Sequence, residues 1–278
     1  KVSLKWRGTS EFVSYQLSRS SKAESGLMGP LVHINGKTMD KNFSVKEINY
    51  EHIPKQYVSQ PSEAKLVRLD LSLPDKKVGY IMGAGDLVQT NLQAIGFPIS
   101  TIEIESISQE ELNEFDTVLV GIRAFNVLES LKYKNKLLFD FAAQGGTLIV
   151  QYNTSRRMQT KEILPYPIEL SRDRVTDENS RVRILEPKNR GLNYPHTITA
   201  KDFEGWVQER GLYFANNWDP KLTPLLGMND EGEREKLGSL LVASHGKGTV
   251  VYTGLSFFRE LPAGVPGAYR LLFNLIAL

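Results

Sequence analysis

The chain has 278 residues, of which 41% are hydrophobic and 24% are charged, so it can bury a core and is not disordered throughout. Its 34 basic and 32 acidic residues leave a net charge of +2, which argues against a nucleic-acid partner or an anionic membrane surface. No apolar run approaches the roughly 18–20 residues of a membrane span, and the absence of cysteine excludes disulfides, thiolate metal ligands and thiol catalysis.

The hydrophobic pattern of residues 1–72 differs from that of the rest of the chain and predicts a separate β-rich domain. The chain begins at Lys1 rather than Met, and we expect it to be a processed piece of a longer polypeptide. Asn35-Gly36 is a strong hairpin-turn signal. Apolar and polar residues alternate at period two, as in half-buried strands, over 12–17, 31–34 and 64–71. We expect a small antiparallel β-sandwich-like domain, joined to the next domain by Leu73-Pro74-Asp75.

Residues 73–278 predict an α/β domain, because short apolar strands alternate with helical segments. Strands are expected at 77–82, 100–104, 117–120 and 147–150. Helices are expected at 87–95, after the capping-box pattern Ser108-Gln-Glu-Glu111, and at 131–143. A hairpin at 240–244 and 249–253 and a helix at 268–278 finish the domain. The alternation is typical of a flavodoxin-like fold with a parallel sheet and helices on both faces.

Polar residues follow these strands, and the carboxyl ends of parallel strands meet at one edge of a sheet, where ligands bind. That rule brings together Gly83, Gly85 and Asp86 after the first strand, Arg123 and Asn126 after the third, Gln151, Tyr152 and Asn153 after the fourth, and Ser256 and Arg259 after the last. Together they predict a polar cleft with two arginines, suited to a hydroxyl-rich or anionic ligand. The alternative is that these residues fix turns and helix caps.

Several motifs in the chain lack residues that known binding or catalytic motifs require. Gly83-Ala-Gly85 lacks the third glycine of a dinucleotide fingerprint and the lysine of a P-loop, so a tight turn is expected, with Asp86 as a helix N-cap. The four histidines have no metal-binding spacing, so we predict no metal and no cofactor. Ser256 lacks the G-x-S-x-G elbow of a nucleophilic serine. Arg156-Arg157 and Arg172-Asp-Arg174 are interpreted as solvated or salt-bridged charges.

The aromatic segment 203–218 is predicted to pack over the cleft as a lid or wall, which adds Glu204 and Trp206 to the ligand-binding residues. Asp202, Glu204 and Glu209 flank Trp206. Paired carboxylates beside aromatics are used by glycosidases, whereas aromatics beside polar groups are also used by sugar-binding clefts and packed loops. The residues alone leave these readings open.

Long stretches of the second domain resemble a known family. The matching segments are Val78-Gly-Tyr-Ile-Met-Gly-Ala-Gly-Asp86, Val120-Gly-Ile-Arg-Ala-Phe-Asn126, Val150-Gln-Tyr-Asn-Thr154, Asp202-Phe-Glu-Gly-Trp-Val-Gln-Glu-Arg-Gly-Leu-Tyr-Phe214 and Tyr252-Thr-Gly-Leu-Ser-Phe-Phe-Arg-Glu-Leu-Pro-Ala-Gly-Val-Pro-Gly-Ala268. They resemble the C-terminal region of large bacterial PIG-L (LmbE-like) deacetylases over residues 73–278, and the preceding β region resembles the spacer domain of the same proteins.

The resemblance implies a class I glutamine amidotransferase-like or ThuA-like fold. In an amidotransferase of this fold a nucleophilic cysteine sits on a tight elbow after the third strand, where this chain has Arg123. The family's zinc-dependent deacetylation of N-acetylglucosamine-type sugars belongs to an N-terminal domain with a His-Pro-Asp-Asp motif, which this chain lacks. The resemblance thus implies that zinc domain as a partner and favours an extracytoplasmic (periplasmic or secreted) location.

The favoured interpretation is a non-catalytic accessory domain of a carbohydrate-acting deacetylase, which binds glycan or docks the catalytic domain. The first alternative is a hydrolase of sugar conjugates that uses the carboxylates near Glu204. The second is a purely structural domain whose cleft is filled by its own loops.

Overall fold

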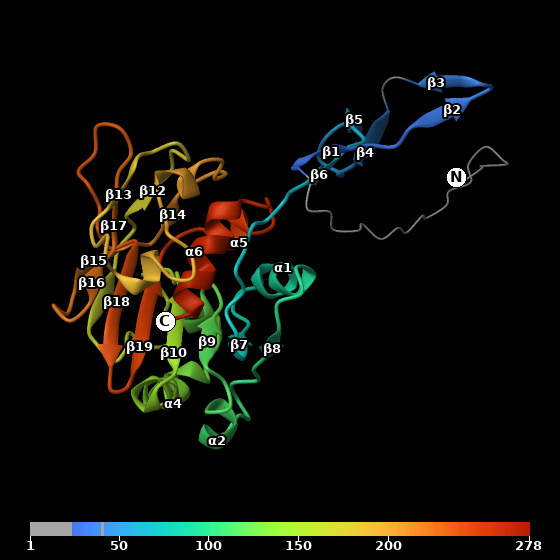
Figure 1. The fold of residues 1–278 in the computed structure, drawn as a ribbon. Helices are drawn as coiled ribbons and strands as arrows, with labels where there is room; N and C mark the ends of the chain where they lie inside the picture. Colours follow the sequence, from blue (N-terminus) through green and yellow to red (C-terminus); the bar gives the residue numbers. More distant parts are fainter. Residues whose placement is uncertain (1–23, 40–41) are drawn as a thin grey trace. The chain divides into compact units, whose positions relative to one another are not determined.

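The computed structural model describes residues 24–39 and 42–278 (Figure 1). The chain divides into two compact units, Lys1–Leu69 and Asp70–Leu278, which we call the β unit and the α/β unit. The sequence places this boundary after residue 72. The strand predicted at 12–17 lies outside the described residues.

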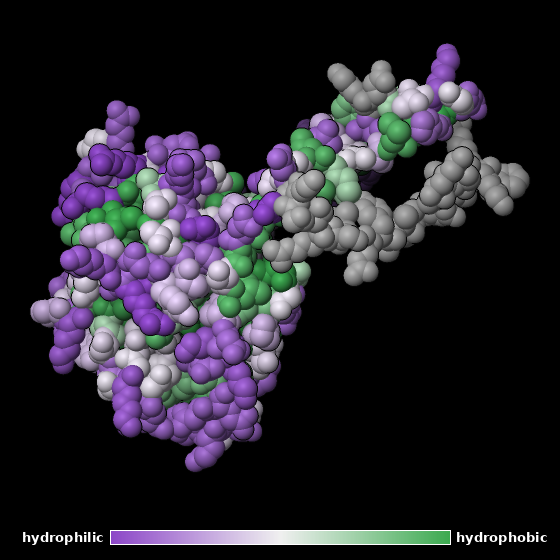
Figure 2. All heavy atoms as spheres, viewed as in Figure 1, coloured by the Kyte–Doolittle hydropathy of each residue, from purple (hydrophilic) through white to green (hydrophobic). Residues whose placement is uncertain are grey.

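The described part of the β unit consists of three separate antiparallel strand pairs. They are β1 (Gly26–Met28) with β6 (Ala64–Leu66), β2 (Val32–Ile34) with β3 (Lys37–Met39), and β4 (Phe43–Ile48) with β5 (Gln56–Pro61). Asn35 and Gly36 form the β2–β3 turn with φ of 49° and 78°, the positive values that an Asn-Gly hairpin turn adopts. The predicted sandwich needs two packed sheets. Over residues 24–39 and 42–69 the strands form only pairs with mostly exposed faces, and several of their hydrophobic side chains lie at the surface (Figure 2).

The α/β unit is built on a seven-stranded, mostly parallel sheet (Figure 1). The strand order is β16 (Thr223–Pro224), β18 (Leu240–His245), β19 (Gly248–Thr253), β10 (Thr147–Gln151), β9 (Thr117–Val120), β7 (Val78–Ile81) and β8 (Ile99–Thr101). The five strands from β8 to β19 are parallel, and β18 and β16 extend the sheet in antiparallel pairs. In chain order the parallel strands run second, first, third, fourth, fifth, which is a common doubly wound arrangement.

The central strands are continuous apolar runs, and their burial explains the parallel sheet. All residues of β7, β9 and β10 are buried, as expected for strands covered on both faces. The helices are few and mostly short: α1 (Val88–Ala94), α2 (Gln109–Leu112), α3 (Ala124–Val127), α4 (Leu131–Gln144), α5 (Phe257–Glu260) and α6 (Pro266–Ile276). Helix α4 packs against β10 and β19, and α6 contacts β10. That helices cover both faces stays a prediction.

The capping box predicted at α2 is confirmed. The Ser108 hydroxyl accepts the backbone N–H of Glu111, whose carboxylate accepts the N–H of Ser108 in return. Gly145 is the C-cap residue of helix α4, with a φ of 130° that few other residues adopt. Among the described helices, none is both long enough and apolar enough to span a bilayer.

The chain between β10 and β18 forms short strand pairs that the sequence pattern did not predict. They are β11 (Ile168–Leu170) with β15 (Ala215–Trp218), β12 (Arg174–Val175) with β14 (Gly211–Leu212), and β13 (Val182–Ile184) with β17 (Leu226–Met228). Two 3₁₀ turns, Arg190–Leu192 and Ala200–Phe203, complete this region. The strand pairs matter for function because they carry residues such as Arg172 and Tyr213 to the carboxyl edge of the sheet.

Candidate ligand-binding cleft

The turn after β9 is a strained elbow with Arg123 at its tip. Arg123 has φ 56° and ψ 20°, the left-handed region, and it is the N-cap residue of α3. The turn is also crowded, because a Cβ added at Gly121 would lie 2.8 Å from the Tyr80 hydroxyl and 2.9 Å from the Gly83 nitrogen. A non-glycine residue pays roughly 1–2 kcal/mol in this conformation. The elbow expected from the resemblance is therefore formed, and it carries an exposed guanidinium group.

The loop after β10 is held beside this elbow by the side-chain amide of Asn126. Its oxygen accepts the N–H of Thr154 at 2.9 Å, and its nitrogen donates to the carbonyls of Thr154 (3.2 Å) and Arg156 (3.1 Å). Arg157, the next residue of the loop, has φ 56°. The carboxyl ends of β9 and β10 thus each present an arginine from left-handed backbone.

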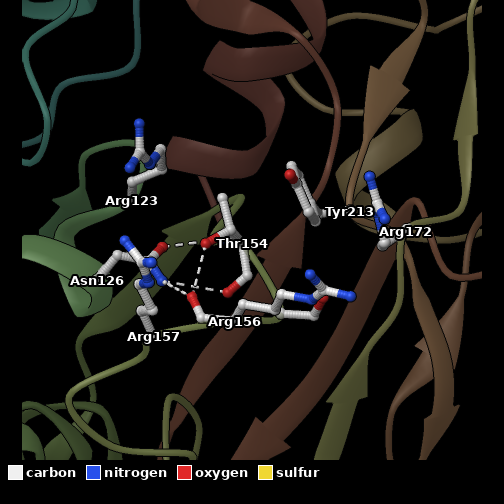
Figure 3. Close-up of a pocket in the computed structure, with 8 residues that line it drawn as sticks. Arg123, Asn126, Thr154, Arg156, Arg157, Arg172 and Tyr213 are labelled. Carbon is white, nitrogen blue, oxygen red and sulfur yellow. Dashed lines mark hydrogen bonds between the residues drawn. The ribbon is translucent and has the colours of Figure 1, made fainter.

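These two strand ends and two more distant loops enclose a pocket of about 370 Å³ (Figure 3). We call it the arginine cleft. It is lined by Arg123, Asn126, Thr154, Ser155, Arg156, Arg157, Arg172 and Tyr213. Arg172 comes from the connection between β11 and β12, and Tyr213 from the connection between β14 and β15. Figure 3 shows Thr154 between Arg123 and Asn126 on one side and Tyr213 and Arg172 on the other.

The arginine cleft is positively charged. Four of its eight lining residues are arginines, and none is a carboxylate. All four arginines are exposed, and none forms an ion pair with another described residue. Each guanidinium group has N–H donors in a planar fork that matches carboxylate, sulfate or phosphate oxygens. The geometry therefore favours an anionic group.

Tyr213 lines the cleft and is supported by an aromatic stack behind it. Tyr213 lies parallel to Tyr152, with ring centroids 5.9 Å apart and 8° between the planes, and Tyr152 also contacts Phe258 at 5.3 Å. Burial raises the pKa of Tyr152, and the charges of Arg123 and Arg259 oppose this rise, so both guanidinium groups lie near the same phenol. Tyr213 has φ 55°.

Left-handed backbone is concentrated at this cleft. Among the described residues, five non-glycine residues have positive φ, and three of them line the cleft: Arg123, Arg157 and Tyr213. Strain of this kind costs of order 1–3 kcal/mol per residue and gathers at functional sites. The remaining two are Asn35, in the β unit, and Gln208.

The structure places two of the ten predicted site residues, Arg123 and Asn126, in the cleft. Arg259 lies nearby but does not line it. Its guanidinium group forms an ion pair with Glu209 at 2.8 Å and donates a second hydrogen bond to the side chain of Gln208. Arg259 thus lowers the pKa of Tyr152 by its charge, while its Nε and Nη1 groups donate to Glu209 and Gln208.

Gln151 and Asn153 are fully buried beneath the cleft. The Asn153 amide accepts the N–H of Phe125 at 2.9 Å and donates to the carbonyl of Gln151 at 3.0 Å. The Gln151 nitrogen lies 3.5 Å from the carbonyl of Val120, and its oxygen has no hydrogen-bond partner. Both amides serve the strand ends rather than the cleft.

Gly85 and Asp86 belong to a tight turn after β7 that does not line the cleft. The Asp86 carboxylate accepts the Tyr80 hydroxyl at 2.7 and 2.6 Å and the N–H of Val88 at 2.9 Å, so it supports the first turn of α1, whose N-cap residue is Leu87. Gly85 has φ 93°, which glycine adopts without strain. The turn interpretation of this loop agrees with these contacts.

Ser256 is buried away from the cleft, beside Glu260. Its hydroxyl oxygen lies 2.8 Å from the Glu209 carbonyl and 3.1 Å from a Glu260 carboxyl oxygen. The other Glu260 oxygen accepts the N–H of Val207 at 2.9 Å. Burial raises the pKa of Glu260 to about 7. Glu260 was not among the predicted site residues, and its only signal in the sequence is its position one helical turn after Ser256, the N-cap residue of α5.

Glu204 and Trp206 lie apart from the cleft. Trp206 is buried, donates its indole N–H to the Asp202 carbonyl at 2.9 Å and packs on Phe203 with ring centroids 5.6 Å apart. Asp202 forms an ion pair with Arg270 at 2.8 Å. Glu204 is exposed in a different pocket, next to Phe203 and Arg210. Of the predicted aromatic wall, only Tyr213 lines the cleft.

Six cleft residues were missing from the predicted site residues: Thr154, Ser155, Arg156, Arg157, Arg172 and Tyr213. The first four directly follow the predicted residues after β10, so the strand-end rule could have found them. Within the described ranges, no three His, Asp or Glu side chains gather in a group that could hold a metal ion.

Neither the known protein-family models nor the curated proteins include a match to this chain. Solved structures are similar to it at low identity. A β-galactosidase of Rahnella sp. R3 is 15% identical with a TM-score of 0.43, over 71% of this chain and 31% of that one. A cytoplasmic protein of Salmonella typhimurium is 12% identical with a TM-score of 0.46, over 91% and 95%.

A ThuA-like protein of Bacteroides uniformis is 11% identical, with a TM-score of 0.44, over 74% of this chain and 92% of that one. The chain thus spans about a third of the β-galactosidase and nearly all of the other two proteins. Likenesses of this size say nothing about what the chain binds. The resemblance to PIG-L deacetylases stays a prediction.

Proposed function

We propose that the α/β unit is a non-catalytic binding module, an accessory domain of a carbohydrate-acting PIG-L-type deacetylase, and that the arginine cleft is its glycan site. The proposal includes the finer fold class, a flavodoxin-like, amidotransferase-like domain with helices on both faces. The observation that carries it is the strained backbone of Arg123, Arg157 and Tyr213 around one pocket. Backbone strain of this kind persists where the surrounding structure enforces it, most often at ligand sites.

The lining of the cleft supports binding rather than turnover. General acid–base catalysis needs a titratable group whose pKa lies near the working pH, within reach of the substrate. The cleft is lined by arginines, hydroxyls, one amide and one tyrosine. The Thr154 hydroxyl donates to the Arg156 carbonyl at 2.9 Å, and no base is among the lining residues to activate it. Of the carboxylates that the hydrolase alternative would use, Asp202 and Glu209 are held in ion pairs and Glu204 lines a different pocket.

The aromatic wall supports a carbohydrate as the ligand. Tyr213 is backed by Tyr152, so its ring is held rigidly beside the hydrogen-bond donors of the cleft. A flat apolar ring next to polar groups suits the amphipathic face of a sugar. The implied partners are therefore a glycan and the N-terminal zinc domain of the same polypeptide, for which the sequence resemblance is the support.

Calorimetric titration of the purified chain tests the proposal, with oligosaccharides in one series and ATP and NAD in the other. We expect binding of at least one oligosaccharide class and no sub-millimolar nucleotide binding. Tyr213→Ala should abolish the sugar signal, whereas Tyr133→Ala, at an exposed tyrosine on α4, should leave it unchanged. Incubation with N-acetylated sugars should release no acetate. Nucleotide binding alone, or no binding at all, would end the proposal, the latter in favour of a purely structural domain.

A further inference from the structure

We infer that the glycan of the arginine cleft is acidic, with a carboxylate or sulfate group held by the guanidinium groups of Arg156 and Arg172 together with Arg123 or Arg157. The inference rests on the proposed function, since it specifies the ligand of the same cleft. It follows from the charges and the hydrogen-bond inventory of the lining residues.

The charge of the cleft is far from the balance of the whole chain. The chain carries only a net charge of +2, yet four arginines and no carboxylate line a pocket of about 370 Å³. Like charges that line one pocket repel one another. Because no described carboxylate is paired with these four groups, an anionic ligand is the partner that would relieve the repulsion.

The hydrogen-bond inventory points the same way. A neutral sugar hydroxyl both donates and accepts, and binding sites match it with amides or carboxylates. Both ends of the Asn126 amide are used by the loop after β10, and the amides of Gln151 and Asn153 are buried in the strand ends. The side-chain donors left in the cleft are mainly guanidinium N–H groups, which cannot accept. A donor-rich cleft is matched by the acceptor-only oxygens of an acid group.

The backbone holds these donors ready. Arg123 lies in the turn after β9 and Arg157 in the loop after β10, and these two strands are adjacent and parallel. Both residues have left-handed backbone, with φ 56° at each. The Asn126 amide fixes the separation of the two turns. An arrangement that is ordered before the ligand arrives loses less entropy on binding.

A nucleotide has acidic groups too, but the cleft lacks its usual phosphate cradle. No glycine loop and no lysine lines the cleft. In the Gly83–Gly85 turn, the amide of Ala84 already donates to the carbonyl of Ile122 at 2.9 Å. A glycan with acid groups on its rings therefore fits the arginines and the tyrosine better than a phosphate chain does.

The test compares oligosaccharides of equal length: an oligogalacturonate with carboxylates, a sulfated cello-oligosaccharide, and neutral cello- and chito-oligosaccharides, with ATP as the nucleotide arm. Calorimetry is run at 50 and 300 mM salt. We expect one of the two acidic sugars to bind at least tenfold more tightly than the neutral ones at low salt, and to weaken at high salt because screening shortens the reach of exposed charges.

Two variants test whether Arg156 and Arg172 bind the acid group of the sugar. Arg156→Gln and Arg172→Gln should each weaken the acidic sugar about tenfold or more, because each removes a charge-assisted hydrogen bond. The matched control is Arg234→Gln, which changes the same charge at an exposed arginine that does not line the cleft. Thermal melting curves of the three variants are measured to check that each of them folds.

Each outcome decides between the two proposals. Neutral sugars that bind as tightly as acidic ones, and that need Tyr213, overturn the acidic inference but leave the binding module in place. Acidic binding that is unchanged in Arg156→Gln and Arg172→Gln also overturns it, because the acid group then lies elsewhere. Binding of ATP without any sugar, or of nothing, ends both proposals.

Discussion

Replacing Glu260 with glutamine should remove a pH dependence from the stability of the α/β unit. Glu260 is fully buried in α5, and burial raises the pKa of its carboxyl from the ordinary 4.5 to about 7. The hydrogen bonds that the Val207 N–H and the Ser256 hydroxyl donate to Glu260 lower this pKa, but the effect of burial outweighs them.

The sign follows from proton linkage. Between pH 4.5 and 7 the folded chain holds a proton at Glu260 that the unfolded chain has released, so the free energy of unfolding falls as the pH rises through this range. Each pKa unit corresponds to about 1.4 kcal/mol, so the full change from pH 4.5 to pH 8 is about 3 kcal/mol. The contribution of Glu260 to the stability is fully present below pH 4.5 and is lost as the pH rises through 7.

Glutamine mimics the protonated acid, because its amide can donate to Ser256 while its oxygen accepts the N–H of Val207. Urea unfolding at pH 4.5, 6 and 8, followed by tryptophan fluorescence, measures wild type, Glu260→Gln and the exposed control Glu103→Gln. We expect equal stabilities near pH 4.5 and Glu260→Gln to be more stable by about 3 kcal/mol at pH 8. A difference between wild type and Glu260→Gln that does not change with pH would refute the reasoning.

Because Arg123 is strained, Arg123→Gly should raise the free energy of unfolding by about 1 kcal/mol in urea titrations and lower the affinity for the glycan. Arg123→Ala keeps the strained backbone, so its free energy of unfolding should not rise. Gly83→Ala should cost about 2 kcal/mol or more in thermal melts, because its Cβ would lie 2.1 Å from the Ile122 carbonyl oxygen. Trp206→Ala should cost about 3–5 kcal/mol by the same melts, and the residual folded protein should bind sugar with unchanged affinity, since Trp206 does not line the cleft. A loss of sugar affinity in folded Trp206→Ala would instead restore the predicted wall.

The sequence was informative where local pattern decides the structure. Continuous apolar runs flanked by glycine and capping residues predicted β7, β9 and β10 and the capping box of α2. The strand-end rule then placed Arg123 and Asn126 at the same cleft. It could not say which polar residues point inward: Gln151 and Asn153 also follow β10, but their amides turn back to pair with the strand ends.

The rest of the cleft depends on long-range pairing that no local pattern reveals. Arg172 and Tyr213 are brought together by β12 and β14, two strands of two residues each, whose pairing is set by tertiary contacts. Arg172 was interpreted as a solvated or paired charge, and only the loop geometry shows that it lines the same pocket as three other arginines. The buried role of Glu260 likewise follows from the packing of α5 against residues 207–210, not from its sequence neighbours.

The close approach of the turns after β7 and β9 also determines from where a ligand reaches the sheet. In a doubly wound sheet of this strand order, molecules usually enter between the first and third strands, where the chain reverses its direction of winding. Here Gly83 and Ala84 lie directly on the backbone of Ile122, with a hydrogen bond of 2.9 Å between the turns, so that entrance is blocked by main chain. The open pocket lies one strand further along, over β9 and β10. A molecule bound in this pocket would therefore lie over β9 and β10, beside Arg123, and not at the switch point itself.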